Sequence, residues 1–405
     1  MSLFSLAKSS ERIGVIIDVG SGSVLVAIVV SNSSKKKPVV VWSHREQAPL
    51  RTIDSMDQSA KSVMTSLINA LLRFDGDGRR ALRDYNKHTN VDEVQCCICA
   101  PWAYTVTKTI TYTQDKPFEI TKALLESLVE SAEKSTRTEL ADNEAVSELG
   151  LTIVTRSTLD TLANGYRVKN PTQREATELS VSHVSVVTQE YLVEHLNDLR
   201  HKIFSDKPLH KLSYMLALYS VADELFGDGG DFSLIDVTYE ATEIGVVRDG
   251  ILTYSTHIPF GSFSLAREIS HITSLPLLQS FQSLHEENPL SFMETLPQSQ
   301  KNEIEIVFEA YTNRLVSLFA ETGDELSIPK KIYLHSDKET ESLFSSLITK
   351  AAAASIRSAP NLKPLSSLLT DLVEVENREN NTDTAMLVAA KFFHTQNIKR
   401  RFEYL

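Results

Sequence analysis

The chain has 405 residues and a formal net charge of −12 at pH 7, with 42% hydrophobic and 23% charged residues. A chain of this length can bury a sizeable core, and we expect it to form two lobes. The acidic balance disfavours nonspecific nucleic-acid binding, which requires a basic surface that displaces counterions. Of the two short basic clusters, residues 35–37 predict a solvated hairpin tip, and residues 399–401 predict either a frayed terminus or a contact with an anionic membrane surface.

Three cysteines, Cys96, Cys97 and Cys99, lie together on an apolar stretch that predicts a strand. The sequence has no second Cys/His cluster at zinc-ligand spacing, so we interpret them as buried thiols in a reducing cytoplasm. The first ten residues are too polar and too short for a secretory signal peptide. No window approaches the roughly 20 apolar residues of a membrane span. We therefore expect a cytoplasmic protein without a transmembrane segment.

The first predicted elements are two apolar strands, residues 14–17 and 24–30, joined by the sequence Asp-Val-Gly-Ser-Gly-Ser. We expect a β-hairpin whose turn can wrap a phosphate, because Gly20 and Gly22 let backbone N–H groups approach an anion closely. Asp18 ends the first strand, where its carboxylate can hold a metal ion through water. Plain tight turns share this pattern, so both interpretations stay open. The candidate phosphate-side residues are Asp18, Gly20, Ser21, Gly22 and Ser23.

Between this hairpin and residue 230, the pattern of apolar and polar residues predicts alternating strands and helices. The expected strands are 38–44, 94–100, 104–112 and 179–187, and the expected helices are 55–74, 190–204 and 213–226. Ser55 and Gln58 have the spacing of a capping box at the start of the first helix. Thr121 is expected to cap a further helix. The glycine-rich residues 227–230 predict a hinge.

A second strand that ends in an aspartate follows the hinge, with Asp236 in the place that Asp18 holds in the first hairpin. An apolar strand returns at residues 244–247, and residues 248–250 predict a tight turn into the next strand. Two such hairpins, about one domain apart, predict two related lobes that face each other across a cleft.

The order of these motifs resembles the superfamily of actin, sugar kinases and heat-shock chaperones, and within it the bacterial FtsA and PilM proteins. Residues 164–171 (Asn-Gly-Tyr-Arg-Val-Lys-Asn-Pro) are similar to a turn of that branch. Residues 257–261 (His-Ile-Pro-Phe-Gly) are similar to the segment after its second phosphate hairpin. Residues 329–334 stand in the place of its adenosine-binding element, and residues 384–393 resemble its last helix, which packs on the first lobe.

The resemblance covers most of the chain and implies an α/β protein. It implies the two-lobed actin-like ATPase fold, with a small α/β subdomain inserted in the first lobe. The expected boundaries are 1–94 and 188–230 for the two parts of the first lobe, 95–187 for the insert, 231–375 for the second lobe, and 376–405 for a C-terminal helix that returns to the first lobe.

The resemblance also implies a site for ATP with magnesium between the two hairpins. Asp18 and Asp236 would then form the pair of carboxylates on the metal side. Both aspartates are present in this chain, so the metal-side residue types of the family are retained.

The second hairpin and the adenosine element depart from the family pattern. Thr238 and Tyr239 stand where paired glycines leave room for phosphates against bare backbone, and Glu240 adds a carboxylate where anions must bind. Ser336 and Asp337 replace two further glycines of the adenosine element. We therefore expect ATP with magnesium to bind weakly or not at all, in an actin-like fold whose nucleotide site has decayed.

Two functions compete. The first is a cytoplasmic scaffold, FtsA-like or PilM-like, that recruits the cytoplasmic segment of a membrane protein in a type IV pilus or cell-division machine at the inner face of the membrane. The absence of an amphipathic tail favours PilM over FtsA. The second is an active ATPase or phosphotransferase, whose phosphoryl positioning the missing glycines undermine. Self-association is open in both cases.

Within the insert, residues 105–113 predict a strand whose edge can pair with an extended peptide. Trp102 and Tyr104 precede this strand and are candidate anchors for such a partner, since aromatic residues dominate hot spots. The alternative is that both aromatic side chains pack inside the subdomain.

Overall fold

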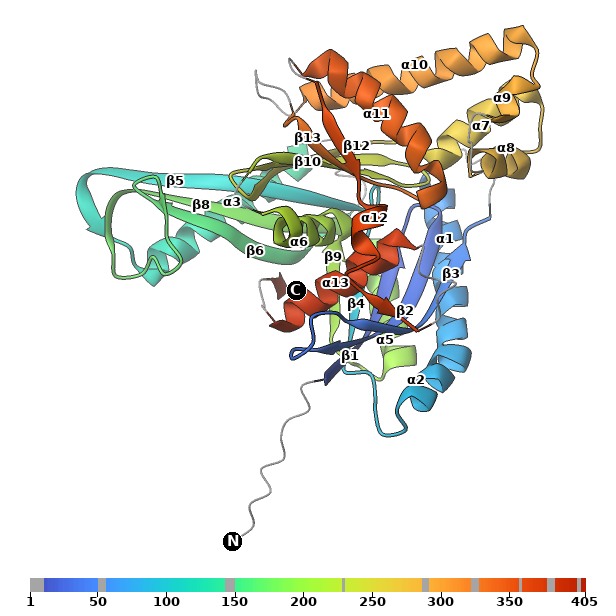
Figure 1. The fold of residues 1–405 in the computed structure, drawn as a ribbon. Helices are drawn as coiled ribbons and strands as arrows, with labels where there is room; N and C mark the ends of the chain where they lie inside the picture. Colours follow the sequence, from blue (N-terminus) through green and yellow to red (C-terminus); the bar gives the residue numbers. More distant parts are fainter. Residues whose placement is uncertain are drawn as a thin grey trace.

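The computed structural model describes residues 11–49, 56–142, 150–227, 230–285, 291–321, 328–356, 359–376, 383–398 and 402–405. These residues form three β-sheets. Two sheets are the centres of two lobes, and the third projects from the first lobe as a long arm (Figure 1). Ser55, and with it the expected capping box, lies outside the described residues.

The first sheet has the strand order β15-β3-β2-β1-β4-β9. Its strands are β1 (Glu11–Val19), β2 (Ser23–Asn32), β3 (Val39–Gln47), β4 (Glu93–Ile98), β9 (Leu209–Ser213) and β15 (Glu374–Val375). β1 pairs with β2 antiparallel and with β4 parallel. Helices α1 (Met56–Arg73) and α13 (Thr384–Ile398) both contact β2. The central strands are therefore nearly continuous apolar runs, as expected where both faces of a sheet are covered.

The second sheet repeats this arrangement with the order β12-β11-β10-β13-β14. Its strands are β10 (Phe232–Val237), β11 (Thr242–Arg248), β12 (Ile251–Ile258), β13 (Lys331–His335) and β14 (Asn361–Pro364). β10 pairs with β11 antiparallel and with β13 parallel, as β1 does with its neighbours. Asp249 and Gly250 have φ of 49° and 72°, so the predicted turn adopts the left-handed backbone of a tight hairpin. The predicted pair of related lobes is confirmed.

The helices of the second lobe gather on its sheet and at its outer end (Figure 1). They are α7 (Ser262–Thr273), α8 (Leu277–Leu284), α9 (Ser291–Glu294), α10 (Gln298–Ala320), the short 3₁₀ turn Lys338–Thr340 and α11 (Glu341–Ser355). Their buried side chains form a separate hydrophobic core with Ile235, Ile244 and Ile332 of the sheet. The opposite face of this sheet contributes Phe232, Leu234 and Val247 to the larger core that also fills the first lobe.

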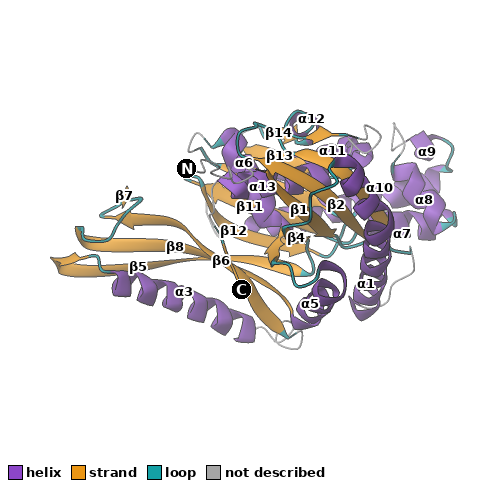
Figure 2. Ribbon diagram, turned by 90° about the horizontal axis from the view of Figure 1, so that it is seen from below, coloured by secondary structure: helices purple, strands orange, loops and turns teal. Residues whose placement is uncertain are grey.

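The arm is the third sheet, with the order β16-β6-β8-β5 and β7 paired to β6. Its strands are β5 (Ala103–Glu119), β6 (Leu151–Ala163), β7 (Tyr166–Arg167), β8 (Glu175–Gln189) and β16 (Glu403–Tyr404). Helix α3 (Lys122–Asp142) packs along β5 and β8 (Figure 2). Thr121 Oγ1 accepts a hydrogen bond from Leu124 N at 3.1 Å, so this residue caps α3 as expected.

The insert differs from the expected 95–187 at its start. All residues of β4 are buried, and β4 pairs with β1 and β9 in the first sheet, so residues 95–98 belong to the first lobe. The inserted sheet begins with β5 and ends with β8. A second difference concerns the last segment, because β16 joins the arm although α13 packs on the first lobe.

The remaining helices connect these parts. They are the π-helical turn Phe74–Gly78, α2 (Arg79–Tyr85), α5 (Glu190–Phe204), α6 (Tyr214–Phe226) and α12 (Ser366–Leu369). Ser213 Oγ accepts a hydrogen bond from Leu216 N at 3.2 Å and so caps α6. The three cysteines are buried and free, as the sequence predicted. Among the described residues, no helix combines the length and the apolar character that crossing a bilayer requires.

Candidate functional site

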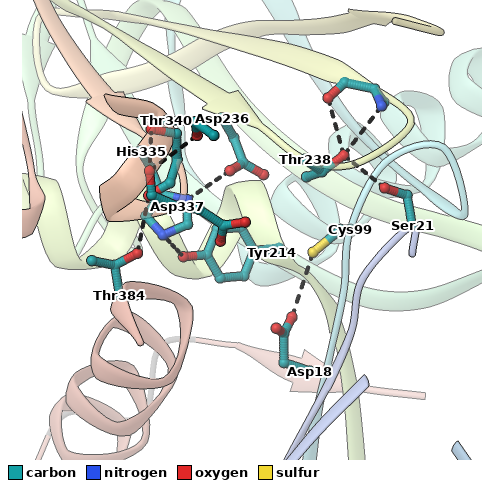
Figure 3. A network of polar contacts seen from close by, with 12 residues as sticks. Asp18, Ser21, Cys99, Tyr214, Asp236, Thr238, His335, Asp337, Thr340 and Thr384 are labelled. Carbon is teal, nitrogen blue, oxygen red and sulfur yellow. Dashed lines mark hydrogen bonds and ion pairs between the residues drawn. The ribbon is translucent and has the colours of Figure 1, made fainter. Parts of the chain in front are cut away.

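The turns of the two aspartate hairpins lie against each other where the lobes meet (Figure 3). Ser21 Oγ of the first turn is 2.9 Å from Thr238 Oγ1 of the second. Glu240 N donates to the same Ser21 Oγ at 2.9 Å. The predicted residues of the two hairpins are thus brought together, but they are hydrogen-bonded directly to each other.

Tyr239 fills the space beside the first turn. Its ring is 4.5 Å from the ring of Phe263 and 5.7 Å from that of Phe281, measured between centroids. A Cβ atom placed on Gly22 would lie only 2.8 Å from Tyr239 Cβ and 2.7 Å from Phe263 Cε2, so this glycine is required by the close approach of the second lobe. Burial raises the pKa of the Tyr239 hydroxyl, which is therefore neutral at physiological pH.

Asp18, the first predicted metal-side carboxylate, is 2% exposed and already has a cationic partner. Arg45 Nη2 is 3.2 Å from Asp18 Oδ2. The same guanidinium donates to Asp383 through Nε at 2.7 Å and through Nη2 at 2.9 Å. Its Nη1 donates to Ser23 Oγ at 2.7 Å. Burial raises the pKa of Asp18, although the charge of Arg45 acts in the opposite direction.

Asp236, the second predicted metal-side carboxylate, is paired with a histidine. His335 Nδ1 is 2.7 Å from Asp236 Oδ1, and His335 Nε2 is 3.0 Å from the hydroxyl of Tyr214 (Figure 3). Burial alone would lower the pKa of His335, but the hydrogen bond and charge of Asp236 outweigh it, so this pKa is raised. Within the described part of the chain, Asp236 Oδ2 has no hydrogen-bond partner. Glu243 lies nearby, and burial followed by the charge of Asp236 raises its pKa to about 8.

The predicted adenosine element is also closed by protein groups. Ser336 is 1% exposed, and its carbonyl accepts from Thr384 Oγ1 at 3.2 Å. Asp337 Oδ2 is 3.5 Å from His285 Nε2. Burial would raise the pKa of Asp337, but the contact with His285 lowers it. The contact of Thr384 with Ser336 joins the first lobe to the second, as the contact of Tyr214 with His335 does. The contact of His285 with Asp337 lies within the second lobe, just after β13.

Glu240 is neutralised within the second lobe. Arg267 Nη1 donates to Glu240 Oε1 at 2.8 Å, and Arg267 Nη2 donates to its other oxygen. The bidentate geometry fixes the carboxylate beside the turn. The extra negative charge that the sequence placed in the site is therefore balanced without a metal ion.

ATP with magnesium would have to displace contacts that the two turns make with each other. A phosphate chain is bound by backbone N–H groups, whereas Glu240 N donates to Ser21 Oγ and the hydroxyls of Ser21 and Thr238 are hydrogen-bonded to each other. Arg45 places a positive charge beside Asp18, and His335 is the hydrogen-bond partner of Asp236. Among the described residues, no group of three or more His, Cys, Asp or Glu side chains has the arrangement of a metal site.

Of the two proposed partner anchors, Trp102 is buried and Tyr104 is half-buried. Trp102 is 3% exposed, and its Nε1 donates to the carbonyl of Gly20 at 3.1 Å, so it supports the first turn from below. The ring of Tyr104 packs on His257 of β12 with 5.4 Å between centroids. The interpretation of these aromatics as surface anchors is wrong for Trp102, which is sequestered from solvent, and Tyr104 serves the contact between arm and second lobe.

Sequence reasoning missed the basic partners of the carboxylates in the site. Arg45, His335 and Arg267 each contact a carboxylate that the sequence had singled out. For Arg45 the register contains a signal, because Asp18 pairs with Leu25 and Leu25 pairs with Arg45, and residues opposite each other share a face. The signal is visible only when the registers of β1, β2 and β3 are known.

Two lobes with the same five-strand order, each with a hairpin whose first strand ends in aspartate, define the actin-like ATPase fold, and this chain has that fold. No family model matches the chain, and no curated protein matches it. Among solved structures, a chain of the PilM-PilN type IV pilus biogenesis complex aligns with a TM-score of 0.57 at 14% identity, over 96% of this chain and 98% of that one.

Two further structures cover the chain with lower scores. A Bacteroides thetaiotaomicron protein, described as having an actin-like ATPase fold and unknown function, aligns over 95% of this chain and 99% of its own with a TM-score of 0.44 at 10% identity. The ethanolamine utilization protein EutJ from Carboxydothermus hydrogenoformans aligns over 93% of this chain and 89% of its own with a TM-score of 0.43 at 9% identity. Identities this low bear on the fold alone.

Proposed function

We propose that the protein is a PilM-like scaffold that recruits a cytoplasmic segment of a membrane protein, and that it neither needs nor hydrolyses ATP. The observation that supports this proposal is the direct hydrogen bonding between the turns of the two hairpins. Ser21, Thr238 and Glu240 bond directly where a nucleotide's phosphates would have to lie. Protein groups thus hold the lobes together in place of a ligand.

The similarity to the chain from the PilM-PilN complex supports a partner in a type IV pilus machine. A role in cell division rests on the sequence resemblance to FtsA alone. The alternative is an active ATPase. It requires the hydrogen bonds between the two hairpin turns to break and Tyr239 to leave its contacts with Phe263 and Phe281. We therefore place the protein at the inner face of the membrane as a binding protein.

The outer half of β5 is the docking edge in this proposal. In the described structure, β5 ends the order of the arm's sheet, and β8 is its hydrogen-bonded neighbour. Thr109, Thr111 and Thr113 are exposed on one face, whereas α3 packs on the sheet. An extended partner segment can add to such an edge through main-chain hydrogen bonds.

Affinity capture from the native host tests the docking edge. The variant Thr111→Asp/Thr113→Asp places charges beside the edge, which opposes strand pairing, and it should lose a membrane-protein partner that the parent recovers. The matched control is Thr65→Asp, because Thr65 is an exposed threonine on α1. Equal recovery of the partner by both variants would mean that the contact lies on the lobes.

Calorimetric titration with ATP and magnesium tests the other half of the proposal. The parent protein should give no saturable heat, because the hairpin turns are hydrogen-bonded to each other. Tight magnesium-dependent binding would overturn the scaffold interpretation in favour of an ATPase.

A further inference from the structure

The edge of the arm opposite β5 carries a strand from a distant part of the same chain. Glu403 lies opposite Arg156 and Tyr404 opposite Thr155 in antiparallel register with β6. Leu405 N donates to the carbonyl of Val154 at 2.9 Å. Figure 2 shows the end of the chain, marked C, beside β6. This edge therefore accepts an added strand, as β16 demonstrates.

An acidic side chain is recognised at the centre of this contact. Arg156 Nε donates to Glu403 Oε2 at 2.9 Å, and Nη2 donates to Oε1 at 3.1 Å, which is a bidentate pair. The third nitrogen, Nη1, donates at 2.9 Å to Glu133 of α3, a residue that is 6% exposed. Glu133 fixes the guanidinium from behind, so Arg156 is preorganised to receive a carboxylate.

Aromatic side chains are recognised on both sides of that acid. The ring of Tyr404 packs on His210 of β9 with 4.3 Å between centroids. His210 is itself held by Glu93, with 3.0 Å between Nε2 and Oε2. The ring of Phe402 lies 5.8 Å from that of Phe392 on α13. The surface thus contacts an aromatic, an acidic and a second aromatic residue in succession along one extended segment.

A groove continues along the same edge beyond β16. It has a volume of about 550 Å³ and is lined by residues 157–161 of β6 together with Arg167, Tyr219, Gly250 and Phe402. β7 pairs with β6 at Leu162 and Ala163 and so closes the far end. The groove leaves space for more of an extended peptide than the two residues of β16 use.

We propose that the edge of β6 is a strand-addition site for extended peptides with an aromatic–acidic–aromatic sequence, and that residues 402–405 occupy it as a displaceable internal ligand. This goes beyond the recruitment role and does not depend on it, because it concerns the edge opposite β5. A paired segment of two residues has little intrinsic stability, so local release is expected to cost little free energy. A partner peptide binds by taking the place of this segment.

Fluorescence anisotropy with a labelled synthetic peptide tests the proposal. The probe has the sequence of residues 399–405, and it is titrated with the full chain and with a chain that lacks residues 402–405. The shortened chain should bind it about 10-fold more tightly or better, because a tethered segment competes at an effective concentration in the millimolar range. Equal affinity of the two chains for the probe would overturn the internal-ligand interpretation.

Substitutions then locate the contact. In the shortened chain, Arg156→Ala should weaken binding about 10-fold, since it removes a charged bidentate hydrogen bond. The matched control Arg137→Ala also removes a contact with Glu133, at 3.4 Å, and should leave binding unchanged. A probe with Glu403→Gln should be insensitive to Arg156→Ala. Equal effects of the two arginine variants would show that Glu403 is not recognised by Arg156.

One further variant covers the case in which the shortened chain fails to fold, as judged by circular dichroism. In the full chain, Glu403→Lys places two positive charges together and should release the segment, so that this variant binds the unmodified probe more tightly than the parent does. A folded Glu403→Lys chain that binds no better than the parent would count against the proposal. None of these readouts involves ATP or a host partner, so they fail or succeed separately from the proposed function.

Discussion

Arg45 is the residue on which the charge balance of the cleft depends. Its guanidinium contacts Asp18 at the end of β1 and Asp383 at the start of α13. Two carboxylates that face one half-buried cation are the arrangement that a metal ion would otherwise stabilise. The side chain of Arg45 therefore links β1, β3 and the start of α13 without a cofactor.

Arg45→Met should therefore destabilise the protein by about 3 kcal/mol, because the buried Asp18 would lose its partner and Asp383 would repel it. Added magnesium or calcium should recover part of the loss in the variant and have no effect on the parent. Urea denaturation with and without the metal measures both effects. Arg267→Met is the control. In the described contacts Arg267 pairs with one carboxylate, Glu240, whereas Arg45 pairs with two. If magnesium or calcium stabilised Arg267→Met as much as Arg45→Met, the idea that Arg45 takes the place of a metal ion would be wrong.

The sequence could place the carboxylates and the turn of the first hairpin, but it could not place their partners. Asp18 and Ser21 are local features of a strand and a turn, so a pattern reveals them. His335 reaches Asp236 only because β10 and β13 are parallel neighbours in register, with Asp236 opposite His335. Such pairings are set by tertiary structure, which residue spacing along one segment does not encode.

At the scale of elements, the turn between β10 and β11 determines what the cleft can hold. Thr238 N bonds to the carbonyl of Ala241 at 2.9 Å, and Thr238 Oγ1 donates to the same carbonyl at 3.0 Å, so the turn is closed upon itself. The side chain of Tyr239 then points at the first hairpin and packs beneath α7 and α8. Thr238 and Tyr239 thus belong to an ordered turn with contacts of its own.

Tyr239→Ala should cost about 2 kcal/mol of stability, because a partly buried aromatic ring loses its contacts and leaves a cavity. Tyr239→Phe should cost less than about 1 kcal/mol, since it keeps the ring. The alanine variant makes room beside Gly22, but it retains the hydrogen bonds of Ser21 to Thr238 and Glu240. We expect it to bind ATP weakly at most in calorimetry. Tight binding would show that steric filling by Tyr239 is the main obstacle.

At the scale of the whole molecule, the two lobes and their order were predictable because apolar strands of a covered sheet are easily read and the hairpin is repeated. Helices α5 and α6 begin and end within a residue of the predicted bounds. The start of the insert was not predictable, because β4 and β5 are separated only by a short turn and both are rich in strand-forming residues. The place of residues 403–404 was hidden for another reason, since a two-residue strand has no periodicity.

Glu243 links the stability of the whole molecule to pH. It lies on β11 opposite His257 and is 3% exposed, and Ser255 Oγ donates to its Oε1 at 2.8 Å. Burial raises its pKa from the ordinary 4.5 to about 8. Between these two values the folded protein holds a proton that the unfolded chain has released, so this group makes stability fall as pH rises through the window. His257 acts in the opposite direction at lower pH, because burial lowers its pKa to about 4.

A comparison with Glu243→Gln isolates this one group, because all other titrating residues are shared. Glutamine keeps an acceptor for Ser255 and cannot ionise, so the variant should match the parent near pH 5 and become progressively more stable than the parent toward pH 8. The difference can grow by at most about 1.4 kcal/mol for each pH unit. Urea denaturation of both proteins across this range measures it. If the free energies of unfolding of the two proteins change in parallel with pH, Glu243 already carries its charge in the folded protein. The surroundings of Glu243 would then be better solvated than its contacts indicate.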